Sequence, residues 1–185
     1  MKAASHILPV AVLALWGAAF LATTQIQASA ATRRPAATQN GQVQAQRDLL
    51  RRQANGILDR EMQRAKDGDC DSAATNAAIN QCLTQRVAIT DLNLKTYENA
   101  LRGLLALEPG SNGQTASSAP QVSRTQEFDQ MEREWRAYLN AATTAASNQL
   151  DEGSGAASTG MLTRLQLVRG HMKELDTIYF SLLHL

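Results

Sequence analysis

Few residues of this chain have types and spacings suited to chemistry. Cys70 and Cys82 are its only cysteines, with eleven residues between them, which is too wide for the C-x-x-C spacing of a redox dithiol. A structural zinc site needs four ligands, and no further cysteine or histidine lies near this pair. The pair is therefore either a disulfide or two free thiols, depending on whether the chain leaves the reducing cytosol.

Residues 1–30 have the three parts of a secretory signal peptide. Lys2 supplies a positive charge, residues 7–22 form an apolar run, and Ala28 and Ala30 provide the small residues of a cleavage site. The run is short for a membrane span of about 20 residues. The sequence predicts cleavage after Ala30, no stable membrane anchor and a location outside the cytosol. There, a disulfide between Cys70 and Cys82 is the favoured interpretation.

Histidines and glutamates offer little for acid–base catalysis. His171 and His184 both fall on the last predicted helix and are interpreted as exposed or half-packed. Glu132 and Glu134 occupy neighbouring helix positions, so their carboxyl groups are expected to point apart. No catalytic residue is predicted among them.

Two other motifs are also interpreted as structural. Ser154 stands in "GSG" and lacks the G-x-S-x-G context of a hydrolase nucleophile. Asp67, Asp69 and Asp71 cluster in "DGDCD", but the Glu of a calcium loop is missing, so they are expected to be charges at a helix end. We therefore predict no enzyme, no metal and no cofactor.

The charge balance excludes two classes of partner. The chain has 18 Lys and Arg against 17 Asp and Glu, and removal of residues 1–30 would take away only Lys2. A mature chain of zero net charge has no basic surface for nucleic acid or for anionic lipid.

Apolar residues spaced three to four apart indicate helices over 43–68, 75–107, 124–150 and 161–185, and no segment alternates with period two. Thr75 suits an N-cap, and Gly68 suits a helix stop. Three segments are rich in Gly, Ser, Pro or Thr. Residues 31–42 precede the first helix and are predicted to be a flexible leader, and residues 108–123 and 151–160 lie between helices and are predicted to be flexible loops. The predicted fold is a single all-α domain over 43–185, with about four helices in a small bundle or an array of helical hairpins.

The cysteine pair constrains this fold. In an unbroken helix, Cys70 and Cys82 would lie about 18 Å apart, whereas a disulfide tolerates only about 4.4–6.8 Å between Cα atoms. Residues 70–74 are therefore expected to leave the helix and fold back against it.

Further motifs follow the cysteine pair in order. "TDLNLKTYENAL" carries Asp91, Asn93 and Tyr97; "EREWRAYLN" carries Arg133, Trp135 and Tyr138; a Gly-Ser segment and Arg169 come next. Over about residues 69–176, these motifs resemble the lysozyme-inhibitor LprI-like family of small exported bacterial proteins. That family typically has a second cysteine pair, and the corresponding positions here hold Thr143 and Leu162. The resemblance is therefore to a divergent member.

The resemblance implies a periplasmic or secreted binding protein that blocks the active-site cleft of lysozyme. Candidate partner-binding residues are Asp151, Glu152 and Ser154, because acidic loops would attract a positively charged lysozyme. Trp135 and Tyr138 are expected in the core, with a partner-binding patch as the alternative.

The remaining motif residues are given structural roles. The polar tips of Asp91, Asn93 and Tyr97 are expected to tie one helix to the next.

A second hypothesis for the whole chain is a periplasmic structural or adaptor protein. It would use the helix over 43–68, outside the resemblance, to bind another cell-envelope protein or a second copy. Apolar residues on the outer face of that helix would favour it.

Overall fold

The structure is a computed structural model that describes residues 36–108, 123–150 and 154–185. These residues form five helices and no strand: α1 (Ala36–Asp67), α2 (Asn76–Ala106), α3 (Arg124–Ser147), α4 (Ser154–Ile178) and α5 (Phe180–His184). The predicted all-α fold is thereby confirmed. The predicted signal peptide and its cleavage site lie outside the described residues.

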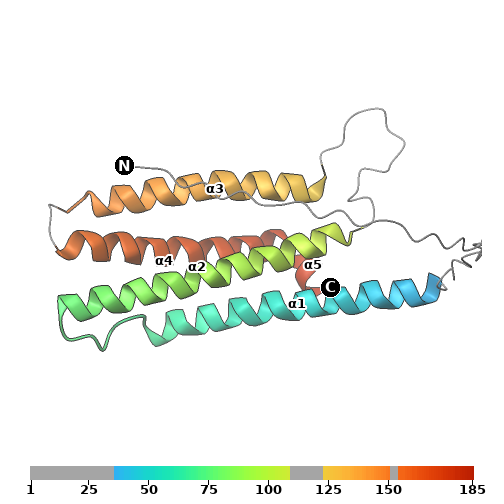
Figure 1. The fold of residues 1–185 in the computed structure, drawn as a ribbon, viewed down its shortest axis with the longest axis horizontal. Helices are drawn as coiled ribbons and strands as arrows, with labels where there is room; N and C mark the ends of the chain where they lie inside the picture. Colours follow the sequence, from blue (N-terminus) through green and yellow to red (C-terminus); the bar gives the residue numbers. More distant parts are fainter. Residues whose placement is uncertain (1–35, 109–122, 151–153) are drawn as a thin grey trace, which may run out of the picture. The chain divides into compact units, whose positions relative to one another are not determined.

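The four long helices form two helical hairpins. The main contacts join α1 to α2, α3 to α4, and α2 to α4. Figure 1 accordingly shows α2 and α4 next to each other between α1 and α3. The short helix α5 packs against α1, α2 and α4. Because α2 and α4 are central, side chains on them can reach both outer helices.

Each helix contributes an apolar stripe to one core. On α2 the buried stripe follows the spacing of three and four that an amphipathic helix requires, with Leu94, Tyr97, Leu101 and Leu104. The same core contains residues of the other helices, namely Ala54, Ile57, Phe128, Leu139, Val168, Met172, Leu175 and Leu183.

Helix α1 is longer than its apolar spacing predicts. It begins at Ala36 rather than Val43, so residues 36–42 are helical and not part of a flexible leader. This segment contains Ala and Gln, which favour helix, and its residues from Asn40 onward are exposed. An exposed helix end has no regular spacing of apolar residues, so a prediction from apolar spacing does not include it. At the other end, α1 ends at Asp67, and Gly68 follows with φ +79°, as predicted for a helix stop.

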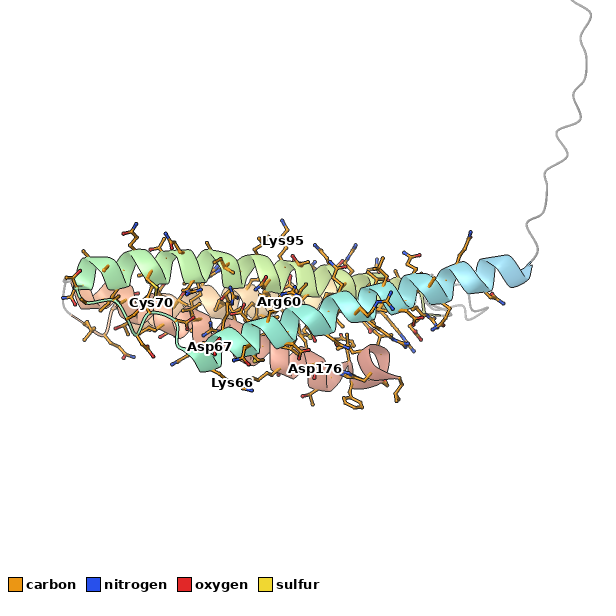
Figure 2. All side chains as sticks on the ribbon, turned by 90° about the horizontal axis from the view of Figure 1, so that it is seen from below. Arg60, Lys66, Asp67, Cys70, Lys95 and Asp176 are labelled. Carbon is orange, nitrogen blue, oxygen red and sulfur yellow. A yellow bond between two sulfur atoms is a disulfide. The ribbon has the colours of Figure 1, made fainter. Side chains whose placement is uncertain are left out.

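The disulfide is present where the sequence predicts it. Cys70 and Cys82 are bonded, with a Cα–Cα distance of 6.0 Å. In Figure 2, Cys70 lies on the segment that leaves the end of α1 and leads to α2. The amide of Ala73 donates to the carbonyl of Cys70 (3.0 Å) in a turn, and the Thr75 hydroxyl caps α2 by accepting from the Ala78 amide (3.2 Å). The segment therefore folds back onto the side of α2.

Helix α4 begins earlier than predicted. Residues 154–160 are helical, although their Gly, Ser and Ala content predicts part of a flexible loop. A Cβ atom at Gly160 would lie 2.1 Å from Oγ of Ser147 and 3.4 Å from the carbonyl oxygen of Thr143. The small residues therefore allow close approach of α4 to α3. No helix in the described part of the chain is long and apolar enough to cross a membrane.

Candidate functional site

Two groups of buried charged residues join the helices. The first group lies between α1, α2 and α4 and includes Glu61 and Arg169, together with Asp69 of the disulfide-containing segment. The second group lies between α2, α3 and α4 and contains Glu98, Glu132 and His171. All of these residues except Asp69 are helical, so the packing of the helices determines their positions.

Arg169 organises the first group. Its Nε donates to Oε1 of Glu61 (3.0 Å), and its two terminal nitrogens donate to the two carboxylate oxygens of Asp69 (2.5 and 2.7 Å). Such a bidentate pair is a strong, directional interaction. The hydrogen bonds from Arg169 lower the pKa of Asp69, against the opposing effect of burial.

Glu61 is completely buried and satisfied. Besides Arg169, it accepts hydrogen bonds from Oγ1 of Thr90 and Nδ2 of Asn93, both at 2.7 Å, and it pairs with Arg64. A buried charge is tolerated only when it is paired and hydrogen-bonded. The carboxylate of Glu61 therefore ties α1 to α2 and α4.

The disulfide holds Asp69 beside this group. The carbonyl oxygen of Asp69 lies 3.2 Å from Sγ of Cys82 and accepts a hydrogen bond of 3.1 Å from Nε of Arg86. Both contacts come from α2. The disulfide therefore attaches Cys70 to the same helix that contacts its neighbour Asp69. The disulfide thus has a structural role.

The family-motif residues on α2 differ in their contacts. Asp91 accepts two hydrogen bonds from Nε of Arg164 (both 3.1 Å), and Asn93 binds Glu61 as described. These two side chains tie helices together, as expected. Tyr97 does not, since its buried hydroxyl has no hydrogen-bond partner among the described residues. Burial raises the pKa of this hydroxyl.

The motif residues on α3 also differ. Trp135 is half-buried and packs on the core, whereas Tyr138 is 58% exposed, contrary to the expectation that it belongs to the core. Helix α3 contacts mainly α4, and its buried stripe runs through Phe128 and Leu139, so Tyr138 falls beyond the edge of that stripe. Arg133 is exposed and donates to Oε1 of Gln130.

The second buried group centres on His171. Its Nε2 lies 3.0 Å from Oε1 of Glu132, and its Nδ1 lies 3.6 Å from Oε2 of Glu174. The imidazole stacks on Trp135, with ring centroids 3.9 Å apart and planes 10° from parallel. His171 is 4% exposed, so the prediction of an exposed or half-packed histidine is wrong here. The period alone cannot show that Trp135 covers the ring.

Glu98 and Glu132 are neighbouring buried carboxyl groups whose pKa values shift in opposite directions. Burial and a hydrogen bond with Glu132 raise the pKa of Glu98 to about 8. Burial also opposes ionisation of Glu132, but hydrogen bonds with His171 and Glu98 outweigh it and lower the pKa of Glu132. Two adjacent buried carboxyl groups cannot both ionise cheaply. Glu98 is therefore the member of the pair that holds a proton more readily, and Nε2 of His171 lies 3.0 Å from Oε1 of the more acidic Glu132.

A cavity of about 380 Å³ opens beside this group and is lined by Glu98, Glu132 and Arg136, among others. Arg136 pairs with Glu98, and its side chain is 51% exposed. The group is therefore buried but lies next to a route from solvent.

Of the three candidate partner-binding residues, only Ser154 is among the residues that the structure describes. Asp151 and Glu152 lie outside the described residues, and Ser154 is the first residue of α4. Along the chain, Asp151 and Glu152 stand between the end of α3 and Ser154, where α4 begins.

Comparison with known families gives a match to the model of the family described as lysozyme inhibitor LprI, over residues 67–175. The chain belongs to the LprI family. No curated protein and no solved structure matches it. The match agrees with the resemblance over about 69–176 and contains α2, α3 and most of α4. In this LprI family member, Glu61 lies outside the matched region, yet it accepts hydrogen bonds from Asn93 and Arg169 within that region.

The buried glutamates were not predicted as a group, although the sequence contains a signal for two of them. Glu61 is four residues after Ile57, and Glu132 is four residues after Phe128, so each falls on the apolar stripe of its helix. A charged residue on such a stripe indicates a buried, paired group. The partner of each group is on another helix, however, and the spacing cannot reveal it.

Proposed function

We propose that this protein is an exported, non-enzymatic inhibitor that binds lysozyme and blocks its active-site cleft. The observation that carries this proposal is the LprI family match, because the family is described as a lysozyme inhibitor. Export to the periplasm or the medium is part of the proposal. An oxidising compartment would maintain the Cys70–Cys82 disulfide, which holds the segment between α1 and α2.

The buried charges support binding rather than catalysis. Glu61, Asp69 and Arg169 bind one another tightly, and His171 is covered by Trp135. In the described residues, the hydrogen bonds and the ring stacking of these groups connect one helix to another, which is a role in helix packing. Packed helices of this kind would give an inhibitor a scaffold that loses little entropy on binding.

The proposed contact region is the connection between α3 and α4, with Asp151 and Glu152, together with Ser154 at the start of α4. Two acidic side chains in a short connection would complement a positively charged enzyme and speed association. Gly160 lets α4 pack closely on α3 just beyond this connection, so its two ends are anchored on packed helices.

The adaptor hypothesis receives less support from the outer face of α1. The exposed residues there are mainly charged or polar, including Arg52, Asp59 and Arg60, and Val43 and Leu49 are the large apolar exceptions. The other face of α1 binds α2 through Glu61. Helix α1 therefore belongs to the fold, and a mainly solvated face is a poor docking surface for a partner.

The test is binding of the exported, oxidised protein to a c-type lysozyme, with bacterial cell lysis measured in parallel. We expect saturable binding and dose-dependent loss of lysis. Both should weaken in the double variant Asp151→Ala/Glu152→Ala. The matched control is Asp59→Ala/Glu134→Ala, which removes the same charge from exposed positions on α1 and α3 and should inhibit normally.

Two results would contradict parts of the proposal. Absence of binding by the folded, oxidised protein would separate this chain from lysozyme inhibition. Equal weakening by both double variants would point to net charge, and not to the α3–α4 connection, as the determinant.

A further inference from the structure

The second buried group has the composition of a metal site. Glu98, Glu132 and His171 come from α2, α3 and α4, and they are 6%, 5% and 4% exposed. One ligand atom from each residue lies within 4.8 Å of the other two. Carboxylate oxygens and an imidazole nitrogen are usual ligands of zinc and related divalent ions.

Three polar atoms in this group lack a hydrogen-bond partner among the described residues. They are Oε1 of Glu98, Oε2 of Glu132 and Nδ1 of His171, and all are buried. Buried polar atoms are normally satisfied by a donor, an acceptor or a bound ion. Two carboxyl groups face a single guanidinium, that of Arg136. The group therefore has spare acceptor capacity and an excess of acidic groups.

We propose that Glu98, Glu132 and His171 bind a divalent transition-metal ion of the zinc class. A tetrahedral ion with bonds of about 2.1 Å keeps its ligand atoms about 3.4 Å apart. Nε2 of His171 and Oε1 of Glu132 are already 3.0 Å apart, so the main adjustment is a movement of the Glu98 carboxylate toward them. Water would complete the coordination from the cavity side.

Ion binding replaces protons in a balanced way. A proton held by Glu98 leaves to solvent when the ion binds, and Nε2 of His171 binds the ion through its lone pair. The imidazole then carries its proton on Nδ1, which faces Oε2 of Glu174 at 3.6 Å. A carboxylate behind a histidine ligand is the usual outer partner in zinc sites. Trp135 holds the ring in place from one side.

Arg136 is the group that opposes the ion. Its guanidinium pairs with Oε2 of Glu98, and two cations on one carboxylate repel each other. The side chain is 51% exposed, so it can move into water when an ion arrives. Two further arginines line the cavity. Arg102 is held by Asp129 at 2.9 Å and Arg133 donates to Oε1 of Gln130, so neither pairs with Glu98.

The first experiment measures binding of zinc chloride by calorimetry and equilibrium dialysis. The protein is expressed with export and purified after removal of the predicted signal peptide, which contains Trp16, so that Trp135 is the only tryptophan. We expect one saturable site per chain. Cobalt(II) at the same site should quench Trp135 fluorescence, because the indole stacks on the ligand His171.

Variants assign the site. His171→Gln should weaken zinc binding about 10-fold or more. His184→Gln is the matched control, since His184 pairs with Asp176 at 2.9 Å outside the buried group and should leave affinity unchanged. Arg136→Gln should strengthen zinc binding, because it removes the competing positive charge and leaves all three ligand residues unchanged.

The proposal has clear contrary outcomes. It fails if the folded wild-type protein shows no saturable zinc binding. It also fails if loss of His184 rather than His171 removes the binding. If His171→Gln does not fold, Arg136→Gln decides, because unchanged or weaker affinity in that variant would overturn the assignment.

Discussion

Nε of Arg169 donates a hydrogen bond of 3.0 Å to Oε1 of Glu61 and thereby joins α4 to a residue outside the family match. Arg169 belongs to the motifs that resemble the LprI family, whereas Glu61 stands on α1, six residues before the match begins at residue 67. The completely buried carboxylate of Glu61 is the acceptor for several donors. In this protein α1 therefore completes the polar interior of the matched helices.

Replacement of Glu61 should be severely destabilising. Glu61→Ala leaves Arg169 without one partner and leaves Thr90 and Asn93 without their acceptor. Breaking a buried pair in this way costs about 3–5 kcal/mol of unfolding free energy. Urea unfolding followed by circular dichroism measures this change. The control Glu134→Ala, at an exposed position, should shift the unfolding free energy by less than about 0.5 kcal/mol. Equal effects of the two variants would show that the hydrogen bonds of Glu61 contribute no more to the unfolding free energy than an exposed glutamate does.

Reduction of the disulfide should cost more than chain entropy alone. The loop between Cys70 and Cys82 spans a sequence separation of 12, which corresponds to about 3 kcal/mol of unfolding free energy in the chain-entropy model. The bond also holds Asp69 near Arg169, so that ion pair should weaken on reduction.

A double cycle tests the link between the disulfide and Asp69. The effect of Asp69→Ala on unfolding free energy is compared between the wild-type pair and the variant Cys70→Ala/Cys82→Ala. We expect a smaller effect of Asp69→Ala without the disulfide, with a coupling of about 0.5–3 kcal/mol. Strict additivity would mean that the segment holds Asp69 in place without the covalent bond.

Acid should destabilise the protein through Asp69. Hydrogen bonds from Arg169 lower the pKa of Asp69 in the folded state. A lowered carboxyl pKa contributes stability that is fully present above the unfolded value of about 3.9. This contribution is lost as the pH falls through the folded value.

The measurement is the unfolding free energy of wild type and Asp69→Asn across the acid range. At neutral pH the variant should be the less stable protein, because a neutral amide cannot replace the ionised carboxylate beside Arg169. Below about pH 4 the difference should shrink. A difference that stays constant down to the acid transition would remove Asp69 from the acid response.

The contact between α3 and α4 can be tested at Gly160. In an open helix position, Gly→Ala stabilises by roughly 1 kcal/mol. Here the new Cβ would lie 2.1 Å from Oγ of Ser147, which itself donates to the carbonyl oxygen of Thr143 (3.1 Å). Gly160→Ala should therefore destabilise the wild-type protein, by about 1–3 kcal/mol.

The companion variant Ser147→Ala removes the obstructing hydroxyl. In that background, Gly160→Ala should be near neutral or stabilising, as measured by thermal unfolding. If Gly160→Ala behaves identically in both backgrounds, the close approach of α4 to Ser147 is not the reason for glycine at this position.

Much of the architecture could be predicted because it depends on local chemistry. The apolar spacing on α2 predicts the helix over 75–107, and the structure has it at Asn76–Ala106 with Thr75 as its N-cap. The two helix starts that were wrong, those of α1 and α4, lie in segments without apolar period. The helix predicted over 161–185 is also divided at Tyr179 into α4 and α5, and α3 ends at Ser147 rather than at residue 150. Residues 40–42 at the start of α1 are exposed, and near the start of α4 a Cβ atom at Gly160 would meet Ser147 of α3. Local composition cannot distinguish a flexible glycine from one that is needed for close packing.

The sequence by itself determined the helices, the stop at Gly68 and the disulfide with its turn, because each depends on residues near one another in the chain. Only the tertiary structure decided that Glu61 meets Arg169 and that Glu98, Glu132 and His171 meet one another. Each of these groups needs side chains from separate helices. Their contact depends on how the two helical hairpins pack through α2 and α4, and helical period carries no information about which helices become neighbours.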